Sequence, residues 1–201
     1  MPPTFEPPDD LFGMEREFVD GSAAYVAAPG PDWGDQPACP IEWELLTAGE
    51  ADAAWADLNA WVHWLRHRFA LPATVVPPYW HRHPELIEEL SALRTHRLAC
   101  YDPEASPSSP ITWMRDLADT ILRLRDWVAL CGTRVNQDRP SRQTAWPGEP
   151  ASDDDGCAVN LADREADFRD FVAADVARRR QIEAAAEAHL RLVRDPDGTG
   201  A

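Results

Sequence analysis

Three series of apolar residues with helical spacing lie between Thr47 and Gly132, and prolines fall at the breaks between them. Apolar residues that recur at steps of three and four place one face of a helix against a core. The pattern predicts an all-α fold with a compact three-helix core over residues 47–132. The apolar positions are Trp55, Leu58, Val62, Leu65 and Phe69, then Leu86, Ile87, Leu90, Leu93, Leu98 and Tyr101, then Met114, Leu117, Ile121, Leu124 and Val128.

Start and stop signals bound these helices. Thr47 followed three residues later by Glu50 is typical of a capping box. Pro84 suits the first position of the second helix, Ser109 is expected to cap the third, and Gly132 is a suitable stop after it. Between the first two helices, residues 73–83 are expected to form a stiff extended connector.

The segments outside the core divide by composition. We expect an acidic, Pro-rich and largely disordered arm over residues 1–46, whose last part is expected to lie against the core. A linker over 133–158, an amphipathic C-terminal helix over 159–194 and a disordered tail over 195–201 are expected to follow the core. Asp175 and Arg179 interrupt the apolar side of the last helix. That helix is therefore expected to be tethered to the core and less firmly docked than the other three.

The chain is acidic, with a formal net charge of -16, and all 19 of its basic residues are Arg. The acidic excess lies at the two ends, because residues 51–146 hold eleven acidic residues and eleven Arg. Net acidity argues against bulk non-specific binding to nucleic acid. No stretch of 18 apolar residues is present, residues 1–10 lack the basic and then apolar run expected of a signal peptide, and the four Cys lie far apart. We expect no membrane span, and reduced thiols in the cytoplasm.

Arg94 and Arg97 break the pattern of the second helix, because helical spacing places both on its apolar side. A buried guanidinium is costly without a partner. The favoured interpretation is structural: each arginine pairs with an acid or reaches the edge of the core, and Arg97 is the better candidate for burial. The alternative is that both line a groove and bind a phosphate or an acidic peptide.

The connector carries Tyr79, Trp80, His81 and His83, which place aromatic rings beside titratable groups. One interpretation is a surface that stacks on a nucleic-acid base or anchors a partner protein. The other, somewhat favoured, is that the two aromatic rings plug the top of the helical hairpin. Trp64 lies outside the main apolar stripe of its helix, which suggests an interface.

No catalytic motif is recognisable, and no cofactor is expected. His63 and His67 lie four residues apart, and His81 and His83 lie two apart, but neither pair has the glutamate of a zinc motif. General acid–base chemistry requires a water-excluding pocket, which sequence does not reveal. We therefore expect no enzymatic activity and no stoichiometric metal.

Three segments, WVHWLRHRFAL (61–71), PPYWHRHP (77–84) and ELSALR (89–94), carry a resemblance, together with Tyr101 and the helix from Trp113 to Arg125. They resemble an uncharacterised bacterial family, domain of unknown function 4913, over about a third of the chain. The resemblance implies a short helical protein of a plasmid, integrative element or phage, in some cases near conjugation genes, and it implies no activity.

Two functions are compatible with these observations. The favoured one is a non-enzymatic accessory or adaptor protein that binds another protein. The alternative is a nucleic-acid-associated protein, because residues 63–97 hold five Arg and five His against three acidic residues.

Overall fold

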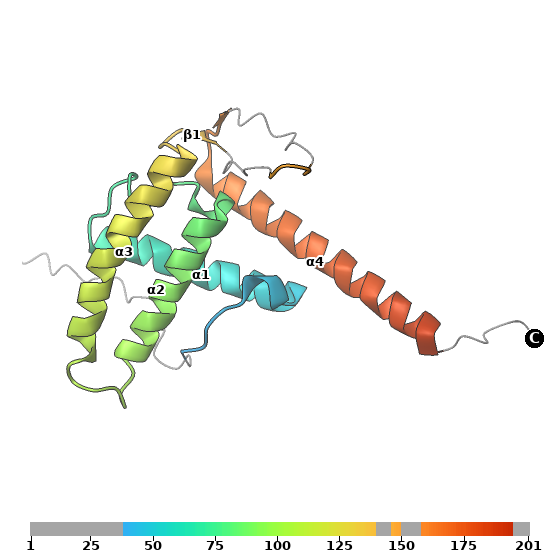
Figure 1. Cartoon of the computed structure of the whole chain (residues 1–201), viewed down its shortest axis with the longest axis horizontal. Coiled ribbons are helices and arrows are strands. Elements are labelled where there is room, and N and C mark those ends of the chain that lie inside the picture. Colours follow the sequence, from blue (N-terminus) through green and yellow to red (C-terminus); the bar gives the residue numbers. More distant parts are fainter. Residues whose placement is uncertain (1–37, 140–145, 150–157, 195–201) are drawn as a thin grey trace, which may run out of the picture. The chain divides into compact units, whose positions relative to one another are not determined.

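The computed structural model describes residues 38–139, 146–149 and 158–194, and this part of the chain is all-α apart from two short strands. Its helices are α1 (Ala48–Arg68), α2 (Pro84–Cys100), α3 (Ser109–Cys131) and α4 (Arg164–Arg194), shown in Figure 1. The strands β1 (Gln137–Asp138) and β2 (Val159–Asn160) pair antiparallel, with Gln137 opposite Asn160. Among these helices, none is long and apolar enough to cross a membrane.

The helix boundaries follow the local signals closely. The capping box is present: the backbone N–H of Glu50 donates to Thr47 Oγ1 at 3.3 Å, and that of Thr47 donates to Glu50 Oε2 at 2.9 Å. Gly132 ends α3 in the left-handed conformation with φ 71°. The N-cap of α3 is Ser108, one residue before the predicted Ser109, so Pro110 occupies the second position of the helix.

The helices α1, α2 and α3 share one core, and α2 and α3 lie side by side (Figure 1). On α3 the buried ring is that of Trp113, which is fully buried, whereas the predicted Met114 is 42% exposed. Adjacent helical positions differ by about 100° in direction, and the larger aromatic ring occupies the inward one. The predicted apolar face of α3 was therefore misplaced at its first position.

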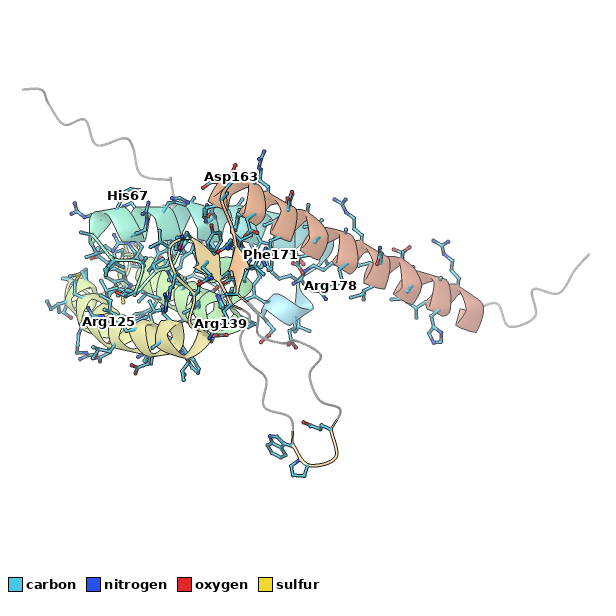
Figure 2. All side chains as sticks on the ribbon, turned by 90° about the horizontal axis from the view of Figure 1, so that it is seen from above. His67, Arg125, Arg139, Asp163, Phe171 and Arg178 are labelled. Carbon is cyan, nitrogen blue, oxygen red and sulfur yellow. The ribbon has the colours of Figure 1, made fainter. Side chains whose placement is uncertain are left out.

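The helix α4 is more firmly docked than predicted, and its first half completes the core. Phe168 and Val176 are buried. The ring of Phe171 (labelled in Figure 2) packs edge-on against the Trp55 ring, with the ring centroids 5.3 Å apart. Asp175 and Arg179, read from the sequence as an interruption, form docking contacts instead. A charged residue on an apolar face is compatible with packing when its partner is buried with it.

Contacts of the Asp175–Arg179 pair explain this correction. Asp175 Oδ2 accepts hydrogen bonds from Trp55 Nε1 at 3.1 Å and from Arg179 Nε at 2.8 Å. Arg179 also donates to the backbone carbonyl of Leu46 at 2.8 Å. The pair therefore joins α4 both to α1 and to the chain that precedes α1.

The segment before Thr47 lies against the core, as expected for the last part of the arm over residues 1–46. Trp43 lies in a short 3₁₀ helix (Trp43–Leu45) and is 6% exposed. Its ring stacks on Trp55 with centroids 4.3 Å apart, and its Nε1 donates to Ser91 Oγ at 2.9 Å. Two aromatic rings bury enough apolar area to hold this segment against the core. Residues 1–37 and 195–201, to which disorder was assigned, lie outside the described residues.

The predicted linker over residues 133–158 also contributes to the core. Thr133 and Asp138 are buried, and β1 pairs with β2 across the segment. Residues 140–145 and 150–157 lie outside the described part of the chain.

Candidate functional site

The connector between α1 and α2 is folded inward. It contains turns and a 3₁₀ helix (Trp80–Arg82), and Tyr79, Trp80, His81 and His83 are each at most 2% exposed. The Tyr79 hydroxyl donates to the backbone carbonyl of Leu161 at 2.8 Å. The expectation of a stiff extended connector is therefore corrected, and the burial of both aromatic rings agrees with the favoured plugging interpretation rather than with an exposed stacking surface. The rings fill the top of the core. Two large aromatic side chains have a lower free energy when buried than when exposed to water.

His81 and Arg82 both bind one carboxylate of α4. His81 Nε2 lies 2.9 Å from Asp167 Oδ2, and Arg82 donates through Nε at 3.0 Å and through Nη2 to the two oxygens of the same group. His81 packs among aromatic rings, including Phe168 at a centroid distance of 5.1 Å. Burial lowers the pKa of His81 to about 4, although its bond to Asp167 opposes that change. At neutral pH, His81 is therefore uncharged and donates to Asp167.

His83 occupies a different environment. Its Nε2 lies 2.8 Å from Asp138 Oδ1, and its Nδ1 lies 3.9 Å from Glu85 Oε1. Burial alone would lower the pKa of His83, but the hydrogen bonds to Asp138 and Cys131 outweigh it and raise the pKa to about 9. Burial would raise the pKa of Asp138, and the bond from His83 outweighs it and lowers that pKa. The surroundings of His83 therefore stabilise a positive charge.

The pKa values of His81 and His83 shift in opposite directions, because the charges of their neighbours differ in sign. His81 faces Arg82 and Arg164 in addition to Asp167. His83 faces carboxylates and a thiol. Both are joined to residues far along the chain, so the polar cluster formed by these two histidines and their partners holds the beginning of the predicted linker and the start of α4 against the core.

Arg94 has a structural environment, as the favoured interpretation required. It is 5% exposed, and its guanidinium lies 3.6 Å from Asp57 of α1. Burial lowers the pKa of Arg94, and the charge of Asp57 opposes that change. Arg94 is thus the buried arginine of the two, whereas the sequence favoured Arg97. The difference is one of depth, since Arg97 lies at the C-terminal end of α2 where the surface is near.

Arg97 is half-buried and stacks among aromatic rings. Its guanidinium carbon lies 4.4 Å from the ring centroid of Trp64, 3.9 Å from that of Tyr101 and 4.7 Å from that of Trp113. Trp64 is half-buried and Tyr101 is 46% exposed. These four residues are called the Arg97 cluster below. It is the place where sequence-predicted candidates from α1 and α2 meet at the surface.

His63 and His67 do not form a metal pair with a third ligand among the described residues. His67 is exposed, and His63 lies 3.7 Å from Glu165 at the rim of a cleft of about 470 Å³. Burial is the largest cause that lowers the pKa of His63, followed by the charge of Arg164. The residues that line the cleft include the apolar side chains of Val62, Leu71 and Trp80.

The aspartate partners of the two histidines, Asp138 and Asp167, and the thiol of Cys131 were not singled out from the sequence as site residues. Asp138 lies in a stretch rich in turn-forming residues, and Asp167 lies on a helix with many acids. Their partners are 55 and 86 residues away. No local pattern signals contacts across such separations.

Three of the ten Arg and His residues that favoured nucleic acid are turned inward, whereas Arg66, His67 and Arg68 remain exposed. His81, His83 and Arg94 are buried, and Arg82 binds Asp167. Comparisons with family models, with curated proteins and with solved structures find no match to this chain.

Proposed function

We propose that this chain is a non-enzymatic adaptor that binds another protein through the Arg97 cluster. The observation that carries the proposal is the position of the Arg97 guanidinium, 3.9–4.7 Å from three ring centroids on a half-exposed surface. Trp, Tyr and Arg are the residues most enriched at the energetic centres of protein interfaces. Their rings offer apolar area with little rotamer entropy to lose on binding.

The chemistry of the cluster favours a partner segment with a carboxylate next to an apolar side chain. No carboxylate of the described residues forms an ion pair with Arg97, and its charge is instead stacked on the rings. An arginine held in place by stacking still presents planar N–H groups to a carboxylate. Arg68, one helical turn after Trp64, is exposed and adds a second positive charge nearby.

The start of α3 adds an exposed apolar side chain, that of Met114. It follows Trp113 directly in the chain and is 42% exposed. An exposed apolar group next in the chain to a ring of the Arg97 cluster suits the apolar half of such a partner segment.

The proposed setting is a mobile genetic element, and the support for it is the resemblance of residues 61–94 and 113–125 to the family of unknown function. The proposed location is the cytoplasm, since Cys39, Cys100 and Cys131 are free thiols, which suits a reducing compartment. A coupling ATPase or relaxase gene beside this one would support a role in conjugation.

A peptide-display selection tests the proposed binding surface. The full chain serves as bait, and the Arg97→Met variant serves for counter-selection. We expect enriched peptides to carry Asp or Glu beside an apolar residue. Arg97→Met should weaken their binding at least about thirtyfold, equivalent to about 2 kcal/mol. Arg125→Met is the matched control, because Arg125 is an exposed residue of α3 (Figure 2) and should leave the affinity within about twofold.

Two results would contradict the proposal. Peptides that bind wild type and Arg97→Met equally would exclude the Arg97 cluster as the interface, provided that a urea melt shows the variant folded. Binding of duplex DNA that falls steeply with salt, without any selected peptide, would favour the nucleic-acid alternative instead.

A further inference from the structure

Three potential metal ligands from two helices converge beside β1. One ligand atom from each of His83, Glu85 and Cys131 lies within 4.8 Å of the other two. His83 Nδ1 lies 3.9 Å from Glu85 Oε1. Ligands of a tetrahedral zinc ion lie about 3.3–3.8 Å apart, given metal–ligand bonds of about 2.0–2.3 Å. The three groups would need to move by less than about 1 Å to reach that spacing.

The fold sets these ligands in place. His83 is the N-cap of α2 and Glu85 lies in its first turn, so both side chains project from the same end of the helix. Cys131 is the last residue of α3, immediately before the turn at Gly132. The pairing of α2 with α3 therefore brings the thiol to the histidine across 48 residues of chain.

Asp138 supplies the outer contact that metal-binding histidines usually have. Its Oδ1 lies 2.8 Å from Nε2 of His83, and Asp138 is 2% exposed. A histidine that donates one ring N–H to a carboxylate presents the lone pair of its other nitrogen to a metal. Nδ1, the nitrogen on the side of Glu85, is thus the ligand atom.

We propose that His83 Nδ1, Glu85 and Cys131 bind one divalent transition-metal ion of the zinc type, with water in the fourth position. Thiolate, imidazole and carboxylate form a donor set that suits Zn²⁺ and excludes Mg²⁺ and Ca²⁺, which prefer oxygen ligands. Binding replaces the thiol proton of Cys131 and the proton on Nδ1 of His83, so two protons pass to solvent for each ion bound. This inference is independent of the proposed protein-binding surface.

The burial of Cys131 and His83 favours a metal site over a catalytic nucleophile at this position. A cysteine beside a histidine and an aspartate also matches a nucleophilic arrangement. Cys131 is 3% exposed and His83 is fully buried, so a substrate carbonyl does not reach the sulfur. The Glu85 side chain is 18% exposed, so one of the three ligands borders solvent.

A second Cys–His pair in the chain provides an internal comparison. Cys100 Sγ lies 3.6 Å from His96 Nδ1, and His96 Nε2 lies 2.9 Å from Asp116. Asp116 contacts only the far nitrogen of His96, and in the part of the chain that the structure describes these three groups do not bring their ligand atoms within 4.8 Å of one another, unlike those at His83. Two protein ligands rarely hold zinc, so this pair should bind it weakly.

Titration of the reduced, metal-free full chain with Co²⁺ tests the site, because cobalt reports thiolate ligation by a near-ultraviolet charge-transfer band and tetrahedral geometry by visible bands. We expect both, saturating at one equivalent and reversed by Zn²⁺. Cys131→Ser should abolish the charge-transfer band, whereas Cys100→Ser and Cys39→Ser should retain it. Asp138→Asn should weaken the affinity about 10–100-fold.

Glu85→Gln keeps the test decisive where a core variant unfolds. Glu85 is half-buried, so this variant should retain the wild-type circular dichroism spectrum and the charge-transfer band, while its affinity for Co²⁺ falls at least about tenfold. The proposal is overturned by the absence of a charge-transfer band at one equivalent of Co²⁺. A band lost in Cys100→Ser and retained in Cys131→Ser also overturns it, as does an affinity unchanged in folded Glu85→Gln.

Discussion

His81 Nε2 lies 2.9 Å from Asp167 Oδ2, and this buried contact joins the turn before α2 to the first turn of α4. The same carboxylate accepts from Arg82, so one side chain of α4 satisfies two donors of the connector. A carboxylate that pairs with buried donors is costly to lose, because those donors remain desolvated. The attachment of α4 to the core is therefore both polar and apolar.

Asp167→Asn should lower the free energy of unfolding by about 2–4 kcal/mol, because it removes the charge that Arg82 and His81 face. A urea melt measures the change. Asp170→Asn is the matched control, since Asp170 is exposed on the same helix and should change the stability by less than about 0.5 kcal/mol. Equal melts for the two variants would contradict the role assigned to Asp167.

Two truncations should separate the docked and the exposed parts of α4. A chain that ends at Glu187 keeps Phe168, Val176 and Arg179, and we expect its melting temperature to fall by no more than about 2–4 °C. A chain that ends at Arg134 loses those residues and exposes Trp55, so we expect it to lose its cooperative transition. A cooperative melt of the shorter chain would show that the three-helix core over residues 47–132 folds without α4, as the sequence alone suggested.

The pair of Arg94 and Asp57 should respond asymmetrically to mutation. The Arg94 side chain is 6% exposed, whereas that of Asp57 is 45% exposed. Arg94→Met removes a costly buried charge and leaves Asp57 in contact with water, so we expect a stability within about 1 kcal/mol of wild type. Asp57→Asn leaves the buried guanidinium without that carboxylate, so it should destabilise by a larger amount. If chemical denaturation showed a larger loss of stability for Arg94→Met than for Asp57→Asn, the charge of Arg94 would itself stabilise the fold.

The stabilising effect of Asp175 should depend on pH. Burial alone would raise the pKa of Asp175, but hydrogen bonds from Arg179 and Trp55 outweigh it and hold the pKa below the ordinary 3.8. A lowered pKa in the folded state means that the stabilisation is complete above 3.8 and disappears as the pH falls through the lowered value. Asp175→Asn should therefore be less stable than wild type by about 2–4 kcal/mol near neutral pH.

That difference between wild type and Asp175→Asn should stay constant between about pH 5 and pH 7 and shrink below pH 3.8. Urea melts at a series of pH values measure it, with Asp170→Asn as the exposed control. A difference that persists unchanged at the acidic end would mean that the carboxylate charge is not what stabilises the contact.

The helices of the core could be predicted from the sequence because their signals are local. The capping box at Thr47, the proline near the start of α2 and the glycine after α3 each act within one helical turn. Apolar spacing of three and four residues places Leu58, Leu90 and Leu124 in the core by the same local rule. The all-α class follows from these signals together.

What the tertiary structure decided is which polar residues are buried together. His81 with Asp167 and His83 with Asp138 meet across 86 and 55 residues, and neither aspartate carries a local signal of burial. Asp175 and Arg179 also lack a local signal of burial. Their charges suggest a solvent-facing side of α4, but in the structure Trp55 donates a hydrogen bond to Asp175. A buried charge is tolerated only where a partner compensates its lost hydration, and that partner is chosen by packing rather than by sequence spacing.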